Sequence, residues 1–398
     1  MGSKKMKIAV VFEGVLHVGG GYQQQLSVFT RLGSLDNKYE ITAFVFSEEN
    51  KKVLKRYNVK TVLVKKTLLD KIHRFLHRQH WFFRFSKSFR LKTLFEKKLK
   101  DNNVDLVYFL SPSGLSLDLI EHNYIITVWD LCHRDFLEFP EVNYYREFEL
   151  REQLYLKALK KAVAVLVDSE PGKENIVRRY GIDDSRIFVA PFTPSINIYL
   201  DNNLDVKTKY KINGEYIYYP AQFWSHKNHV YIIDALSILM SQGFTLTAVF
   251  SGSDKGNLKY VMNYAKKMGV EDLIKYIGFA PNEEIYSLYK NSIALVMPTY
   301  FGPTNIPPLE AFSIGVPVIY SDLKGLKEQV GDAALLCDLS DPNSLATHLK
   351  NLLESEKLRI NLIEKGKQKL KELSRYDILE TLDTIFTNYS IKMKCWKY

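Results

Sequence analysis

Residues 298–319 read Pro298-Thr-Tyr-Phe-Gly-Pro-Thr-Asn-Ile-Pro-Pro-Leu-Glu310-Ala-Phe-Ser-Ile-Gly315-Val-Pro-Val-Ile319. The pattern predicts the end of a strand, an irregular loop, a helix, a glycine and a second buried strand. A loop rich in Gly and Pro that opens onto a helix N-terminus offers unpaired backbone N–H groups to an anion. Glu310 is expected in the first turn of that helix, where its carboxylate can accept hydrogen bonds from hydroxyl groups beside the anion. An anion next to a polyol is what a nucleotide sugar presents.

The same stretch resembles the donor-binding motif of bacterial glycosyltransferase family 4, which has the GT-B fold. Glu310-Ala311 and Gly315-Val316-Pro317-Val318 match the second half of that motif. The family typically has another glutamate eight positions before Glu310, where this chain has Gly302, so one acidic contact to a donor sugar hydroxyl is missing. The run Gly302-Pro303-Thr304-Asn305 is similar to that of a subset of the family that builds surface polysaccharides.

Alternating strand and helix patterns along the 398 residues predict two α/β domains with parallel sheets. We expect strands at 7–12, 41–46, 61–64, 106–110, 125–128 and 163–167, and again at 216–220, 245–251, 293–298 and 316–320. The prediction is two doubly wound Rossmann-like domains, 1–193 and 194–375, facing across a cleft. The resemblance further implies that the first domain binds the acceptor, that the second binds the donor, and that a last helix, 376–398, crosses back to the first.

Lys227 lies in the stretch Tyr219-Pro-Ala-Gln-Phe-Trp-Ser-His-Lys-Asn-His229, which follows the first strand expected in the second domain. A lysine at the start of the next helix can bind a diphosphate beside free helix amides. The resemblance implies this role, and with it a catalytic contribution, for Lys227. It also implies an arginine where this chain has Gln222, which brings hydrogen bonds but no charge. The alternative is that Lys227 is a solvated residue at a helix start.

The resemblance implies further donor contacts in the second domain. Glu310 would bind the ribose hydroxyl groups, and Phe279 would frame the base. The loop before the helix would lie beside the diphosphate and the donor sugar through Gly302, Pro303, Thr304, Asn305 and Ile306. The alternatives are structural, because Glu310 could complement the helix dipole and the loop residues could serve the loop alone.

Gly19-Gly20-Gly21 follows the first expected strand and is predicted to form a turn that permits positive φ. The resemblance implies that Gly20 and Gly21 face the donor phosphate, and a purely structural turn is the alternative. Farther along the first domain, Ser169 precedes acidic residues and is expected to cap a helix.

Asp130 and His133 follow the strand expected at 125–128. The resemblance implies a histidine near the acceptor at the position of Trp129, and His133, two positions beyond Asp130-Leu131, could take over that polar role. Asp130 and His133 are therefore candidate catalytic residues. A structural role for a lone loop histidine is the alternative.

The chain has 55 Lys and Arg against 45 Asp and Glu, which gives a net charge of +10. The excess of basic residues is concentrated in one part of the sequence. Residues 51–100 contain 17 Lys and Arg but only Asp70 and Glu96 as acidic residues. Within this part, residues 71–92 predict a basic helix with aromatic residues on its apolar side, which would lie at an anionic membrane surface. The alternatives are a domain helix with a solvated basic face and, without any supporting motif, a nucleic-acid contact.

Cys132, Cys337 and Cys395 are few and far apart, which argues against a disulfide framework and favours a reducing cytosol. The apolar stretch near the N-terminus is too short for a secretory signal, and no apolar run approaches the roughly 18 residues of a transmembrane helix. We expect a cytoplasmic protein, peripheral at the inner face of the cell membrane if the basic segment contacts it. No His or carboxylate cluster has metal-ligand spacing, so neither a metal nor a cofactor is expected.

Together these features predict a glycosyltransferase, and the family 4 resemblance implies that it retains the anomeric configuration. It would move a hexose or deoxyhexose from a nucleotide diphosphate sugar to a lipid-linked saccharide acceptor. The product would be a lipopolysaccharide or a capsule. Two alternatives are a sugar-nucleotide epimerase of the same fold and a catalytically silent GT-B partner in an assembly. Gly302 and Gln222 are the best support for the silent partner.

Overall fold

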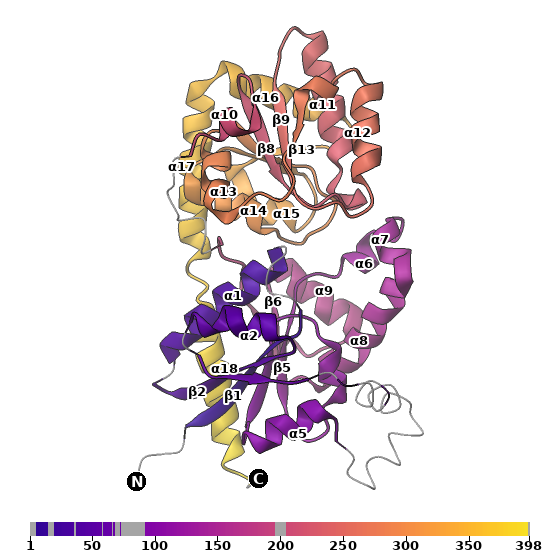
Figure 1. The fold of residues 1–398 in the computed structure, drawn as a ribbon. Coiled ribbons are helices and arrows are strands. Elements are labelled where there is room, and N and C mark those ends of the chain that lie inside the picture. The colour runs from indigo at the N-terminus through magenta and orange to yellow at the C-terminus, as the bar shows by residue number, and fades with distance from the viewer. Residues whose placement is uncertain are drawn as a thin grey trace. The chain divides into compact units, whose positions relative to one another are not determined.

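The computed structural model describes residues 5–14, 20–35, 37–57, 59–65, 67, 72, 92–195 and 204–396. The chain folds into two compact units (Figure 1). The first comprises Met1–Leu131, Glu149–Pro191 and Tyr376–Tyr398, and the second comprises Cys132–Phe148 and Phe192–Arg375. The basic segment 71–92, for which membrane contact is predicted, lies outside the described residues except for positions 72 and 92.

A parallel sheet forms the centre of the first unit. Its described strands are β1 (Met6–Phe12), β2 (Tyr39–Val45), β3 (Thr61–Leu63), β4 (Leu106–Phe109), β5 (Tyr124–Val128), β6 (Ala164–Val167) and β7 (Ile187–Val189). They lie in the order β3-β2-β1-β4-β5-β6-β7, and every neighbouring pair is parallel. This is the doubly wound order, which reverses between β1 and β4. The central strands are almost wholly buried apolar runs, as a parallel sheet covered on both faces requires.

Helices connect these strands (Figure 1). They are α1 (Gly20–Leu32), α2 (Glu48–Lys55), α5 (Leu94–Asp101), α8 (Glu147–Lys161) and α9 (Glu170–Tyr180). The last helix of the chain, α18 (Ile378–Met393), also belongs to this unit but connects no strands. Ser169 caps α9 as predicted, because its hydroxyl accepts a hydrogen bond from the N–H of Gly172 at 3.2 Å. Gly181 ends the same helix in the left-handed region, with φ 63°.

The helix α18 joins the first unit although it follows the second unit in sequence (Figure 1). Arg31 on α1 pairs with Asp377, the residue that precedes α18, at 2.7 Å. Near the other end of α18, the hydroxyl of Tyr389 donates to the carbonyl oxygen of Asp105 at 3.1 Å. Polar contacts at both ends therefore hold the helix on the first unit.

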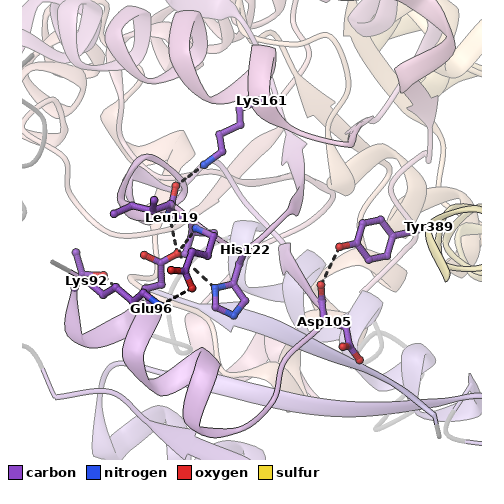
Figure 2. A network of polar contacts seen from close by, with 10 residues as sticks. Lys92, Glu96, Asp105, Leu119, His122, Lys161 and Tyr389 are labelled. Carbon is purple, nitrogen blue, oxygen red and sulfur yellow. Dashed lines mark hydrogen bonds and ion pairs between the residues drawn. The ribbon is translucent and has the colours of Figure 1, made fainter. Parts of the chain in front are cut away.

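A buried carboxylate orders the loop that precedes β5 (Figure 2). Glu96 on α5 is fully buried and accepts hydrogen bonds from the backbone N–H groups of Ile120 and Glu121, each at 2.7 Å. Its Oε1 also lies 3.4 Å from Nδ1 of His122. Burial by itself would raise the pKa of Glu96, but the hydrogen bonds from His122 and the two amides outweigh it and hold the pKa below its usual value. We assign this network a structural role.

A second parallel sheet forms the centre of the second unit. Its described strands are β8 (Tyr216–Pro220), β9 (Thr247–Ser251), β10 (Ile274–Tyr276), β11 (Ala294–Met297), β12 (Val318–Ser321) and β13 (Leu335–Cys337). They lie in the order β10-β9-β8-β11-β12-β13 with every neighbouring pair parallel. The sheet is again doubly wound, and its order reverses between β8 and β11.

The second unit has more helices than the first among the described residues. They are α6 (Cys132–Asp135), α7 (Pro140–Asn143), α10 (Val206–Tyr210), α11 (His229–Ser241), α12 (Leu258–Lys267), α13 (Asn282–Lys290), α14 (Ile306–Ile314), α15 (Leu326–Val330), α16 (Pro342–Glu354) and α17 (Glu356–Leu373). The helix α14 begins before its two prolines, because proline fits the first turn of a helix. Among the described residues, no helix combines the length and the apolar character that a bilayer crossing requires.

Tyrosines fill much of the core of the second unit. Fully buried ones stand on the central strands and on α13, namely Tyr216, Tyr218, Tyr219, Tyr289 and Tyr320. The rings of Tyr218 and Tyr289 are perpendicular, with centroids 5.0 Å apart. Because a buried hydroxyl needs a hydrogen-bond partner, each such tyrosine places a polar contact inside an apolar layer. Three of them, Tyr219, Tyr289 and Tyr320, contact residues of the site described next.

Candidate functional site

Two of the predicted donor-binding residues, Lys227 and Asn305, lie where the strand order of the second unit reverses. In a doubly wound sheet, ligands bind outside the carboxyl ends of the strands at that point. The segment after β8 carries Lys227, and the segment after β11 carries Thr299 and Asn305 and leads into α14. Nζ of Lys227 lies 3.5 Å from both Thr299 Oγ1 and Asn305 Oδ1. The structure therefore brings Lys227 and Asn305 together, although 78 positions separate them in sequence.

Lys227 ends a short 3-10 turn, Ser225–Lys227, instead of beginning the following helix as predicted. Asn228 separates the turn from α11 with a left-handed φ of 55°. From the sheet below, the hydroxyl of Tyr219 donates to the carbonyl oxygen of Lys227 at 2.7 Å. This contact fixes the backbone of Lys227, a partly buried residue whose ammonium group lies beside the residue that precedes α14.

The start of α14 offers fewer N–H donors than the sequence pattern suggested. Its first three positions are Ile306, Pro307 and Pro308, and proline has no N–H group. Only Ile306 among these three retains an N–H for an anion, although the positive end of the helix dipole remains. A diphosphate at this site would therefore depend on the charge of Lys227 more than a helix start alone would suggest.

Gly302 stands where the family resemblance leads one to expect a glutamate, and a side chain at this position would require a neighbouring side chain to shift. A Cβ at this position would lie 2.6 Å from Cδ2 of Leu326, a buried residue at the start of α15. On the other side, a Cβ at Gly325 would lie 2.7 Å from Cβ of Pro303, and Gly325 has φ +91°. The loop is thus packed against α15 through two glycines. A side chain at position 302 would be directed at Leu326.

Glu310 lies in the second turn of α14, which corrects the expectation of a first-turn position. Its Oε2 accepts a hydrogen bond from the hydroxyl of Tyr289 at 2.9 Å. Burial raises the pKa of Glu310 to about 7, even though hydrogen bonds from Tyr289 and the backbone of Ser195 act in the opposite direction. Because the helix dipole acts mainly within the first turn, dipole compensation explains this carboxylate poorly. A hydroxyl-rich ligand would supply hydrogen bonds to its ionised form.

We predict that Glu310→Gln removes a pH-dependent destabilisation of the unliganded protein. The folded-state pKa of about 7 exceeds the ordinary value of 4.5, so the folded state binds this proton more tightly than the unfolded state. Its contribution to stability is therefore present below pH 4.5 and is lost as the pH rises to about 7, by up to about 3 kcal/mol. Urea unfolding at pH 5 and pH 7.5 measures this effect. The variant should gain on the wild type at the higher pH, and an equal difference at both pH values would contradict the pKa.

The ends of β9 and β10 lie close together beside the segment after β8. The N–H of Gly252 donates to the carbonyl oxygen of Gly278 at 2.8 Å. The next residue, Phe279, has 57% of its surface exposed. Oε1 of Gln222 accepts a hydrogen bond from the indole Nε1 of Trp224 at 3.0 Å, so this glutamine has a structural partner. An exposed ring at the carboxyl edge of the sheet is suited to packing against a base.

Gly20 and Gly21 begin α1, so the turn predicted for them is wrong at these two positions. Gly19 lies outside the described residues. At Gly21 the absence of a side chain has a packing reason, because a Cβ there would lie 2.6 Å from Cη2 of Trp129. The indole of Trp129 occupies the space that a side chain at position 21 would need.

Asp130 and His133 each contact a neighbouring side chain within their own unit. Asp130, in the first unit, pairs through Oδ1 with Nη2 of Arg151 at 2.6 Å. Burial by itself would lower the pKa of Arg151, but the charge of Asp130 raises it well above its usual value. His133, in the second unit, is fully buried, with its ring 5.8 Å from that of Phe148. Catalytic roles for Asp130 and His133 stay predictions.

Sequence reasoning missed His226, next to Lys227, and its partner Glu141. Glu141 Oε1 accepts a hydrogen bond from the backbone N–H of His226 at 2.9 Å and lies 2.5 Å from its Nδ1. The imidazole also stacks on Phe301, with centroids 3.8 Å apart. No local signal could have found the pair, because 85 positions separate the two residues. The contact joins the segment 132–148 to the loops after β8 and β11 within the second unit.

Solved structures with the same two-sheet architecture identify the fold. The glycosyltransferase from Rickettsia africae matches with a TM-score of 0.69 and 16% identity, over 97% of this chain and 98% of that one. This is the GT-B glycosyltransferase fold. Another GT-B match is Alr3699/HepE from Anabaena in complex with UDP and glucose, with a TM-score of 0.70 and 16% identity over 98% of this chain and 100% of that one.

Residues 202–369, which include the candidate site of this GT-B chain, match the family described as glycosyl transferases group 1. O-antigen chain mannosyltransferase B from Escherichia coli is 25% identical over 59% of this chain and 63% of its own length. O-antigen chain mannosyltransferase RfbU from Salmonella typhimurium is 26% identical over 49% of this chain and 52% of its own length. The chain thus spans less than two thirds of the length of these two relatives.

Proposed function

We propose that this protein is a glycosyltransferase that binds a nucleotide diphosphate sugar in its second unit and transfers the sugar to a saccharide acceptor. The observation that carries the proposal is the position of Lys227 beside Asn305 at the start of α14, where the sheet order reverses. The match of residues 202–369 to glycosyl transferases group 1 includes these residues. It supports the same assignment from the sequence.

In this proposal the ammonium of Lys227 balances the charge that develops on the leaving diphosphate. The N–H of Ile306 and the dipole of α14 would assist it. Ionised Glu310 would accept hydrogen bonds from the ribose, and Phe279 would pack against the base. Transfer with retention follows from the family 4 resemblance, with the leaving phosphate taking the acceptor proton, because no protein nucleophile stands out in the sequence.

In this proposal the acceptor is an intermediate of surface polysaccharide synthesis. The protein acts in the cytoplasm, at the inner face of the membrane. The relatives named O-antigen chain mannosyltransferases support a growing saccharide as acceptor and a hexose as the transferred sugar. A lipid-linked acceptor would suit the excess of basic residues in positions 51–100. Segment 71–92 would then be the part that contacts anionic lipid.

A thermal-shift panel with UDP, GDP, dTDP, ADP and CMP, each with its sugar conjugates, tests the donor class. Ligand at 100 times its dissociation constant stabilises a protein by about 2.7 kcal/mol, so the preferred nucleotide should give a clear and selective shift. Incubating that sugar nucleotide with and without saccharide acceptors tests the reaction. Isomerisation of the donor without an acceptor would indicate an epimerase, and the absence of any shift would indicate a silent assembly partner.

A further inference from the structure

The side-chain amide of Gln329 holds the backbone of Asn305 from both sides. Gln329 Oε1 accepts the N–H of Asn305 at 3.0 Å, and Gln329 Nε2 donates to the carbonyl oxygen of Asn305 at 2.6 Å. Gln329 lies on α15 and is 7% exposed, so the pairing is nearly closed to solvent. A two-point contact of this kind fixes both the position and the direction of the chain where α14 begins.

Tyr320 closes the arrangement from the end of β12. Its buried hydroxyl lies 2.7 Å from Nδ2 of Asn305, which donates to it, and itself donates to Gln329 Oε1 at 3.2 Å. Nδ2 of Asn305 also donates to the carbonyl oxygen of Phe301 at 3.1 Å. Both donor positions of the Asn305 amide are therefore in use. Its Oδ1 is left as the atom that faces Nζ of Lys227, at 3.5 Å.

The network of Gln329, Tyr320 and Asn305 carries no charge. This matters because it lies beside Gly302, where the family resemblance leads one to expect a carboxylate. In the backbone seen here, a side chain at position 302 would be directed at Leu326, so the loop cannot supply a carboxylate from that position without repacking. Order in the loop comes instead from an amide and a phenol, which place no negative charge beside a bound diphosphate. Because Gln329 and Tyr320 are buried, their hydrogen bonds are also costly to break, which makes the network rigid.

We infer that Gln329 and Tyr320 are positioning residues for diphosphate recognition: they orient Asn305 so that its Oδ1 holds the ammonium of Lys227 toward the diphosphate. The inference rests on the proposed function. Neither residue touches the donor in this scheme. Their effect passes through Asn305 to Lys227, and it concerns the diphosphate part of the donor alone.

The test compares nucleoside diphosphates with monophosphates in two variants of the full chain. Tyr320→Phe removes one hydroxyl, and Gln329→Met removes both polar atoms of the amide at nearly equal length. Calorimetry with UDP and UMP, GDP and GMP, dTDP and dTMP, and ADP and AMP gives the preference for diphosphate over monophosphate. We expect that preference to fall about fivefold to tenfold in each variant, with the monophosphate affinity unchanged.

Tyr216→Phe is the matched control. It removes a buried hydroxyl that donates to the carbonyl oxygen of Leu288 at 2.8 Å and takes no part in the hydrogen bonds of this loop. It should leave the preference unchanged. An unchanged preference in Tyr320→Phe and Gln329→Met would overturn the inference, and so would an equal loss of diphosphate and monophosphate binding, which marks a merely structural role. If the wild type binds none of the eight nucleotides, the proposed function itself is overturned and this inference with it.

Discussion

Lys227→Ala is expected to weaken nucleoside diphosphate binding by about 10- to 150-fold, and to lower kcat/KM for sugar transfer by at least as much. A charge-assisted hydrogen bond contributes roughly 1.5–3 kcal/mol, and 1.4 kcal/mol corresponds to a factor of ten. The upper part of the range is favoured here, because Pro307 and Pro308 remove two N–H donors from the start of α14. Gln222 brings no charge that could replace the lysine.

The stability of the protein should change little in this variant, because Lys227 is only partly buried and its contacts with Thr299 and Asn305 are long, at 3.5 Å. Calorimetric titration, steady-state turnover and the thermal midpoint separate the two effects. Lys259→Ala, an exposed lysine on α12, is the matched loss of one charge and should leave binding and turnover unchanged. Wild-type turnover in Lys227→Ala would refute the assignment of the diphosphate site.

The sequence predicted the fold well where the physical signal is local. Apolar runs such as those of β1 and β8 bury nearly every residue, so their strands could be read from composition alone. The strands β7, β10 and β13 were not predicted, because three residues give only a weak pattern. The equally short β3 was predicted because it lies in the β-branched and apolar run 61–64. Sheet edges of this length form through pairing with a neighbouring strand, and that pairing is not a local property.

The residues of the candidate site also fall into those with a local sequence signal and those without one. Lys227, Asn305 and Glu310 lie in or beside motifs, and the loop–helix pattern was enough to select them. Gln329 and Tyr320 carry no such signal, since their importance comes from hydrogen bonds to Asn305 across 24 and 15 positions. The same holds for Gly302, whose missing carboxylate looked like a loss of function in the sequence. In the structure the glycine packs closely against Leu326, whose side chain would have to shift to admit any other residue.

Among glycine-to-alanine substitutions in the second unit, Gly252→Ala should lower the stability of the unit most. Gly252 follows β9 with φ +148°, and a Cβ there would lie 2.3 Å from the carbonyl oxygen of Ala221 and 2.8 Å from the backbone N of Gln222. These are backbone atoms, so no side-chain rotation can relieve the clash. Overpacking costs about 1–3 kcal/mol and an unfavourable φ about as much again, so we expect a loss of about 3 kcal/mol or more.

Hydrogen exchange of backbone amides in β8 and β9 measures this loss, because it reports the free energy of opening the second unit. Gly243→Ala is the matched control: its φ is +83°, and nothing lies within 4 Å of the added Cβ, so it bears the conformational strain without the clash. Its cost should be about 1–2 kcal/mol. Similar exchange in the two variants would mean that the segment after β8 moves away from Gly252 at little cost.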